Sequence, residues 1–441
     1  MRGIGRQRRL RGPVILGMAA MVAIAVGGSL AATQASAATK APAAARSGYG
    51  GLSISKQYFG STVEPYTGKE TAVYRYTLSN AEGMSVKILT YGGILQEINV
   101  PGANGSKADV ILGFKTLQDY VTYDSPPVTA NGGPYFGELI GRYGNRIANG
   151  TFTLDQPGVG PVTYHVPINN NGNSLHGGLV GFGNHIWSAE EVRGPGSVGL
   201  QLTLVSPNGD QGYPATLKDV TTFTLNNSDQ LGIHYKLTNE SSNLNTVTNV
   251  TDHAYFNLAG ENSPAGSAYG QLLQINADKY TPTNLTQIPL GYNVSVFGTP
   301  FNFTTPHTIG GRIDDVSAPD HAPAAFNQLL LAQGYDHNWV LNKQTGATTG
   351  PDGLNLAAHA WDPSSGRELT VWTDQPGVQV YTSNFLTGTL VGISGHTYRQ
   401  GAGYTFETQH FPNSPNQPNF PSTELDAGKT FTSTTVFAFS S

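Results

Sequence analysis

Residues 198–205 read VGLQLTLV and residues 231–237 read LGIHYKL, and these two stretches decide the fold class. In the first, leucine occupies every second position between glutamine and threonine; in the second, leucine, isoleucine, tyrosine and leucine alternate in the same way. A period of two places the apolar side chains on one face of an extended chain and the others on the opposite face. Both stretches are therefore predicted to be half-buried strands of antiparallel sheets.

Similar short segments recur along the chain, separated by turn-forming residues. Only residues 325–333 (AFNQLLLAQ) are predicted to be helical. Many short strands without alternating helices predict an all-β sandwich or closed barrel. Because no repeat of fixed period and no Pro/Ser-rich linker follows residue 57, we expect residues 52–441 to form a single domain. The other predicted strands are 84–90, 94–100, 108–114, 151–154, 162–168, 219–225, 246–257, 337–341, 368–373, 377–383 and 430–439.

The composition of the 441 residues agrees with this class. Gly (55) and Pro (27) are frequent, while charged residues reach 12%, about half the usual share. With 38% hydrophobic residues the chain can bury a large core, which excludes general disorder. There is no Cys, which excludes disulfides, thiolate catalysis and Cys-based metal sites.

The N-terminal residues have the pattern of an export signal. Five arginines come first, followed by an uncharged run over residues 13–32 and a small Ala-Ser-Ala triplet that ends at Ala37. We expect residues 1–37 to be a signal peptide, residues 38–51 to be a flexible spacer, and the mature protein to be secreted without stable membrane insertion. Retention of the apolar run as an anchor is the alternative, and both the Sec and the twin-arginine routes stay open.

Loss of the signal would make the chain more acidic. The full sequence has 24 Lys and Arg against 29 Asp and Glu, a formal net charge of −5; without the five signal arginines the charge would be −10. Nucleic acid is not an expected partner, because phosphate binding needs clustered basic residues.

Common catalytic motifs are absent from the sequence. There is no H-E-x-x-H, no EF-hand loop and no G-x-S-x-G, and the 11 His residues are scattered. No metal site, phosphate loop or serine-hydrolase elbow is therefore predicted.

Two glycine-rich loops carry the first candidate site residues. The segment GRYGNRIANGTF (141–152) places Asn145 and Arg146 among glycines, which let a ligand approach closely, and a guanidinium can bind several hydroxyl groups. The segment NNNGNSLHGG (169–178) places His176 in a similar loop. Spacing alone favours the alternatives, which are a solvated turn for the arginine segment and a surface position for the histidine.

Two titratable residues stand inside apolar, strand-like runs. His253 lies in NVTDHAYFNLAG (249–260), where its ring is either hydrogen-bonded to the backbone or a proton donor facing a pocket. Glu407 lies in YTFETQHFPNSPNQPNFP (404–421). Burial there would raise its proton affinity and suit it to general acid or base catalysis; the alternative is a solvent-facing position on the polar side of its strand.

Asp336 and Gln379 complete the set of candidates. They lie in GYDHNWVL (334–341) and GVQVYTSNFL (377–386), at the start of or within predicted strands. A carboxylate accepts hydrogen bonds and an amide both donates and accepts, so both side chains suit a ligand rich in hydroxyl groups.

Taken together, these segments resemble the aldose 1-epimerase (galactose mutarotase) family. The match extends in order along nearly the whole mature chain, which is far more specific than any single motif. The export signal and the expanded segments 155–163 and 313–328 depart from the common pattern and leave the preferred sugar open. The matching segments are LTYGGILQEINVP (89–101), ADVILGF (108–114), PYFGELIGRYGNRI (134–147), NSLHGG (173–178), HAYFNLAG (253–260), YDHNW (335–339), GVQVYTSNF (377–385) and ETQHFPNSPNQPNFP (407–421).

The resemblance implies a large antiparallel β-sandwich and an isomerase that interconverts the α and β anomers of free aldohexoses such as glucose and galactose. It implies that Glu407 is the general base and His253 the general acid. Opening and reclosing a pyranose ring breaks and re-forms the bond between C1 and the ring oxygen with the help of proton transfers alone, so no cofactor and no metal are expected. The residues implied to hold the sugar are Asn145, Arg146, His176, Asp336 and Gln379.

Other functions on the same fold are a carbohydrate-binding module and a glycosidase or lyase that acts on polysaccharide. A lectin has no need of both Glu407 and His253, and the matched segments contain no recognisable pair of catalytic carboxylates. A phosphosugar epimerase is disfavoured because the matched site offers one arginine and little other positive charge.

Overall fold

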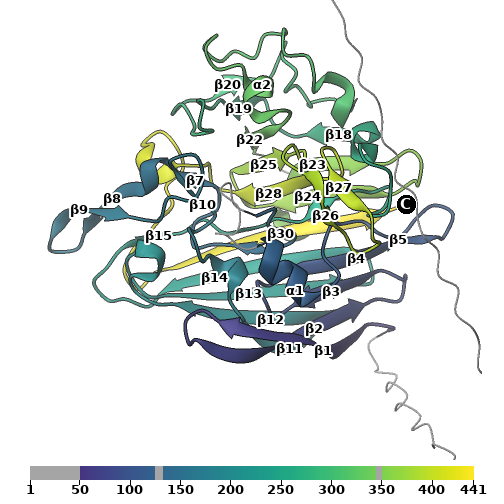
Figure 1. Ribbon diagram of the computed structural model, residues 1–441, viewed down its shortest axis with the longest axis horizontal. Coiled ribbons are helices and arrows are strands. Elements are labelled where there is room, and N and C mark those ends of the chain that lie inside the picture. Colours follow the sequence, from purple (N-terminus) through teal and green to yellow (C-terminus); the bar gives the residue numbers. More distant parts are fainter. Residues whose placement is uncertain (1–49, 125–132, 344–349) are drawn as a thin grey trace, which may run out of the picture. The chain divides into compact units, whose positions relative to one another are not determined.

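Three antiparallel sheets contain most of the strands in this computed structural model, which describes residues 50–124, 133–343 and 350–441 (Figure 1). The all-β prediction is confirmed, and the sheets form a sandwich. The predicted signal peptide and the spacer up to residue 49 lie outside the described residues. Within the described ranges, no helix is long and apolar enough to cross a bilayer.

The three sheets have five, nine and six strands. In order of pairing, the first contains β1 (Ser53–Glu64), β2 (Lys69–Ser79), β3 (Ser85–Leu89), β4 (Leu95–Pro101) and β5 (Lys107–Asp109). The second contains β11 (Ser188–Gly194), β12 (Ser197–Ser206), β13 (Leu217–Asn226), β14 (Gln230–Asn239), β30 (Thr430–Ser440), β24 (Glu368–Thr373), β23 (Asn355–Trp361), β18 (Leu272–Ile275) and β21 (His307–Thr308). The third contains β17 (Tyr255–Phe256), β28 (Tyr404–Gln409), β25 (Gly377–Tyr381), β22 (Asp336–Val340), β19 (Lys279–Thr281) and β20 (Val294–Ser295).

Smaller elements surround these sheets. Two-stranded ladders pair β6 (Leu139–Ile140) with β16 (Thr251–Asp252), β7 (Arg146–Ile147) with β10 (Ser174–Leu175), β8 (Thr151–Gln156) with β9 (Gly160–His165), β15 (Thr246–Val247) with β29 (Glu424–Leu425), and β26 (Thr387–Val391) with β27 (Thr397–Arg399). The described residues include two short α-helices, α1 (Leu117–Asp119) and α2 (Gln328–Ala332). Single turns of 3-10 helix cover Ala148–Gly150, Phe182–Asn184, Asp210–Gly212, Ser267–Gly270, Ile309–Arg312, Pro351–Gly353 and Ser414–Asn416, and a π turn covers Tyr120–Asp124.

One apolar cluster joins the three large sheets. It contains Ile88 of β3, Phe223 of β13 and Phe406 of β28, all essentially inaccessible to solvent. In β13, every second residue is fully buried and the residues between are partly exposed, as a period of two requires. Burial of each such side chain stabilises the fold by about 1.5–3 kcal/mol, so this shared core fixes the position of the six-stranded sheet.

The six-stranded sheet presents different chemistry on its two faces. Phe406 of β28 and Val380 of β25 belong to the apolar core. Glu407 follows Phe406 and Gln379 precedes Val380, so both side chains point to the opposite face of the sheet. The two residues are directly paired across β28 and β25. The same alternation that buries the core therefore brings the polar side chains of these strands together on the opposite face.

Three predicted elements differ from the observed ones. The predicted strand 246–257 is three two-residue strands, β15, β16 and β17, because each pairs with a different partner: β29, β6 and β28. The predicted strand 108–114 ends at residue 109, and the predicted helix 325–333 is limited to α2. The long strand β1 was not predicted because it is an edge strand that is mostly exposed and lacks apolar alternation. The neighbouring strand β2 was not predicted either, because its buried residues Val73, Tyr76 and Leu78 do not keep a strict period of two.

Candidate active site

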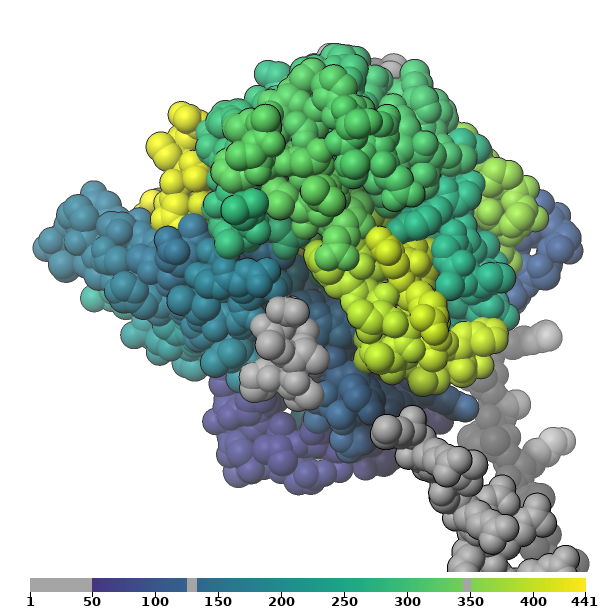
Figure 2. All heavy atoms as spheres, turned by 45° about the horizontal axis from the view of Figure 1, so that its top comes forward, coloured from purple at the N-terminus to yellow at the C-terminus, as the bar shows by residue number. Residues whose placement is uncertain are grey.

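A cavity of about 390 Å³ lies over the polar face of the six-stranded sheet. Figure 2 shows one face of the molecule, on which segments near residues 135–180 (blue) and 380–410 (yellow-green) lie on either side below a green cap. Six of the seven predicted site residues line the cavity, and Gln379 does not. The six are Asn145, Arg146, His176, His253, Asp336 and Glu407.

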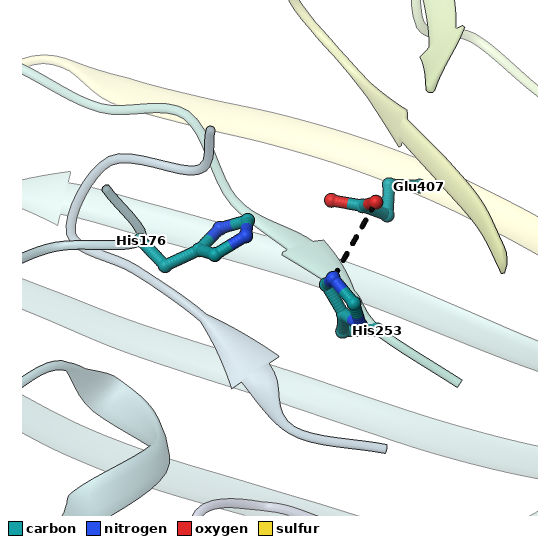
Figure 3. A group of neighbouring side chains, drawn as sticks. All are labelled: His176, His253 and Glu407. Atoms are coloured by element: carbon teal, nitrogen blue, oxygen red, sulfur yellow. Dashed lines mark ion pairs between the residues drawn. The ribbon is translucent and has the colours of Figure 1, made fainter. Parts of the chain in front are cut away.

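Glu407 and His253 are in direct contact within this cavity (Figure 3). Glu407 Oε1 lies 3.5 Å from His253 Nε2, and both side chains are at least 95% buried. Thr405, two residues earlier on β28, donates its hydroxyl to the same Oε1. Glu407 Oε2 and His253 Nδ1 have no hydrogen-bond partner among the described residues. An unpartnered buried carboxylate oxygen is costly unless a ligand or water completes it, so the pair is arranged to receive one.

Burial changes the proton affinities of both groups. It raises the pKa of Glu407 well above its usual value, and the negative charge of Asp336 raises it further. It lowers the pKa of His253 to about 3, because the imidazolium loses its hydration. Both shifts favour the neutral forms of the pair, with the proton on the carboxyl group. The solvent-facing alternative for Glu407 is wrong.

His176 is held as a neutral hydrogen-bond donor. Its Nδ1 accepts the backbone N–H of Asn145 at 3.2 Å, which assigns the ring proton to Nε2. Burial, followed by the nearby His253 and Arg146, lowers the pKa of His176 well below its usual value. The surface position considered for His176 is therefore wrong: its ring lies edge-on to His253, with 5.2 Å between the ring centroids (Figure 3).

Asn145 serves mainly to shape the loop that carries Arg146. Its backbone has a φ of 59°, in the left-handed region that asparagine tolerates better than most residues. Its side-chain oxygen accepts the backbone N–H of Arg146 at 2.9 Å. The loop is thereby fixed, and the guanidinium of Arg146 is buried against the cavity instead of being solvated.

A residue that the sequence analysis missed, Gln287, connects Arg146 to Asp336. Arg146 Nη2 donates to Gln287 Oε1 at 2.5 Å, and Gln287 Nε2 donates to Asp336 Oδ2 at 2.8 Å. Gln287 also lines the cavity. It lies in the turn after β19, where TNLTQIPLG carries no motif, so only the three-dimensional arrangement identifies it.

Gln379 lies behind Asp336. Its Nε2 donates to Asp336 Oδ1 at 2.7 Å, so the two oxygens of this carboxylate are each held by one amide. Gln379 is thus placed to orient Asp336, and Asp336 faces the cavity.

The other arginine of the same segment, Arg142, has a structural position. It is 2% exposed and donates to four backbone carbonyls, at residues 206, 207, 214 and 215. Burial lowers its pKa to about 10, so it stays charged at neutral pH. Arg146 is therefore the arginine of the segment that faces the cavity.

Within the described part of the chain, His176, His253 and Glu407 are the group that could hold a metal ion. Each offers one ligand atom, and these atoms lie within 4.8 Å of one another. Two imidazoles and a carboxylate suit a divalent transition metal such as Zn²⁺. With metal–ligand bonds of about 2.0–2.2 Å, the side chains would have to draw closer together to bind one.

Comparisons with known proteins agree on one family. A family model described as Aldose 1-epimerase matches residues 74–438. Galactose mutarotase of Rattus norvegicus is 37% identical over 369 residues, which cover 84% of this chain and 94% of the relative. Aldose 1-epimerase of Escherichia coli (strain K12) is 30% identical over 365 residues, covering 82% and 94%.

A solved structure gives the same result at the level of the fold. Galactose 1-epimerase of Lactobacillus acidophilus superimposes with a TM-score of 0.69 at 26% sequence identity, over 88% of this chain and 99% of that one.

Proposed function

Because the chain belongs to the aldose 1-epimerase family, we propose that Glu407 and His253 carry out the proton transfers that interconvert the anomers of its sugar. The chain is an isomerase that acts on a free aldose, and the comparisons do not favour a carbohydrate-binding module or a polysaccharide-acting enzyme. The observation that supports these two roles is the contact between the buried side chains of Glu407 and His253, each of which keeps one polar atom without a hydrogen-bond partner among the described residues.

The reaction begins from the charged pair. The neutral pair holds one transferable proton, and movement of this proton from Glu407 to His253 Nε2 gives the carboxylate and imidazolium. Glu407 then takes the proton of the C1 hydroxyl while His253 gives its proton to the ring oxygen. The bond between C1 and the ring oxygen breaks, and the C1–O bond becomes the carbonyl of the open-chain aldehyde.

Ring closure is the same process in reverse. After rotation about the C1–C2 bond, the hydroxyl that was the ring oxygen attacks the other face of the aldehyde carbon. His253 takes back its proton from that hydroxyl, and Glu407 returns its proton to the carbonyl oxygen. Each group ends in its starting state, so the cycle consumes nothing.

The remaining polar residues hold the sugar in this geometry. Asp336 accepts hydrogen bonds from sugar hydroxyl groups, Arg146 donates hydrogen bonds to hydroxyl oxygens, and His176 donates one from Nε2. These hydrogen bonds fix the orientation of the sugar relative to Glu407 and His253. Such orientation supplies a large part of the rate advantage of a bound substrate over one free in solution. Asn145, Gln287 and Gln379 act through the groups they orient.

The test is the change in optical rotation of freshly dissolved α-D-glucose and α-D-galactose. We expect the purified chain from residue 38 onward to accelerate it, and both Glu407→Gln and His253→Ala to lower that acceleration by about 10²–10⁴-fold. Glu424→Gln, at an exposed position, is the control and should retain the parent rate. Acceleration undiminished in both site variants would refute the assignment.

We also propose that the chain is exported. Support comes from the sequence alone: the basic start, the uncharged run over residues 13–32 and the small residues that end at Ala37. Expression of the full chain in a bacterial host should give an exported protein whose mass corresponds to a start at Ala38. A full-length product retained inside the cell would contradict the proposal.

A further inference from the structure

We propose that this chain acts on the reducing end of an oligosaccharide, with the second sugar ring seated between Tyr123 and Phe385. The inference rests on the proposed function, because it assumes that the reducing ring is held at Glu407 and His253. It goes beyond that function in naming a second binding site and the class of substrate that fills it.

The lining of the cavity has two kinds of surface. The proposed aldose site accounts for the polar side chains, yet the same cavity is also lined by Tyr123, Phe385, Leu386 and Leu390. One aldose carries hydroxyl groups around its ring and gains little from so much apolar surface. The C–H faces of a sugar ring are apolar, however, and pack against aromatic rings, as in other ligand sites that combine apolar walls with a few polar groups.

Tyr123 and Phe385 are unusually exposed for residues of their size. Each has 47% of its surface accessible, and both belong to the cavity lining. Phe385 is nevertheless fixed: its ring stacks on that of Tyr381 at a centroid distance of 5.8 Å, and its backbone N–H donates to the Tyr381 hydroxyl at 2.9 Å. An exposed aromatic ring held rigidly beside a polar site is a ready surface for stacking, because little side-chain entropy is lost on binding.

A second cavity of about 340 Å³ lies beside the first. Tyr123 and Thr389 line both, so the two cavities are neighbours on either side of these residues. The second cavity adds Lys115, Thr116 and Asp119, which offer donors and acceptors to hydroxyl groups. One basic and one acidic residue there suit an uncharged sugar chain better than a phosphorylated one.

The test compares sugars of increasing length. Rates of exchange between anomers are measured by proton NMR for D-glucose, for maltose and maltotriose, and for cellobiose and cellotriose. We expect kcat/KM for at least one of the two trisaccharides to exceed that for D-glucose by about tenfold or more, equivalent to about 1.4 kcal/mol. Equal or lower kcat/KM for all the longer sugars would overturn the inference while leaving the proposed function intact.

Variants locate the second site. Phe385→Ala and Tyr123→Ala should each remove most of the trisaccharide advantage and leave kcat/KM for D-glucose within about twofold. Phe297→Ala is the matched control, since this ring is 51% exposed and lines neither cavity. A loss that is equal for glucose and trisaccharide in both variants would contradict a separate second site. No exchange with any sugar in the parent protein would instead refute the proposed function, and the inference would fall with it.

Discussion

Gln287 offers a sharp test of how the sugar site is held together. Its amide joins Arg146 to Asp336 by one hydrogen bond to each charged group. The substitution Gln287→Asn keeps an amide and suits the backbone, which has a φ of 61° at this position, a value that asparagine tolerates well. It withdraws the amide by one methylene group, so neither hydrogen bond can be made with good geometry.

The magnitude follows from those two bonds. A hydrogen bond to a charged group contributes about 1.5–3 kcal/mol. Because Arg146 and Asp336 line a cavity that water can enter, water replaces part of what is lost. We therefore expect a net loss of about 1.5–3 kcal/mol in transition-state stabilisation, or roughly a 10- to 150-fold fall in kcat/KM.

The division between KM and kcat identifies the mechanism. The hydrogen bonds of the Gln287 side chain reach Arg146 and Asp336 and do not involve the Glu407–His253 pair. The fall should appear mainly as a higher KM for D-galactose, measured by polarimetry, with kcat within about threefold of the parent. Gln400→Ala, at an exposed position, is the control. An unchanged KM, or a loss confined to kcat, would refute the positioning role.

Three further predictions concern titration, stability and metal ions. Burial and then Asp336 raise the pKa of Glu407. The reaction needs the one proton that the Glu407–His253 pair holds, so kcat/KM should fall as the pH is raised through that pKa and the pair loses this proton. Asp336→Asn should move this alkaline limb to lower pH, and an unmoved limb would contradict the coupling. Arg142→Met leaves four buried backbone carbonyls without their donor, so urea unfolding should show a loss of at least about 3 kcal/mol, whereas a loss below about 1 kcal/mol would refute the structural role. Dialysis against EDTA should leave the rate of anomer exchange unchanged, and a loss of activity on chelation would contradict a mechanism without metal. Added Zn²⁺ should inhibit competitively with sugar, because it binds His176, His253 and Glu407.

The strands that build the core could be predicted from the sequence because their alternation is simple. The stretch VGLQLTLV corresponds to β12, and residues 368–373 are β24 as predicted. The predicted strand 246–257 was wrong in extent, since its pairing partners come from three distant parts of the chain, and local pattern carries no information about them. Edge strands such as β1 escape the same pattern because both of their faces are largely exposed.

The site residues that could be predicted from the sequence are those that lie in segments resembling the aldose 1-epimerase family. Six of the seven residues named from the resemblance line one cavity, although spacing alone had favoured solvated positions for Arg146 and His176. Gln379 was correctly placed near the site, but its amide contacts Asp336 and it does not line the cavity. Gln287 could not be found from sequence, because its importance comes only from reaching two charged groups that are 141 and 49 residues away.

The most direct test of acid–base catalysis by the buried pair separates binding from exchange in a single variant. Glu407→Gln replaces the carboxylate by an amide of nearly the same shape and removes the proposed base. Titration calorimetry should give a dissociation constant for D-galactose within a few-fold of the parent value, while NMR should show anomer exchange slowed by about 10²–10⁴-fold. Exchange at the parent rate with binding intact would contradict the central claim that Glu407 moves the proton.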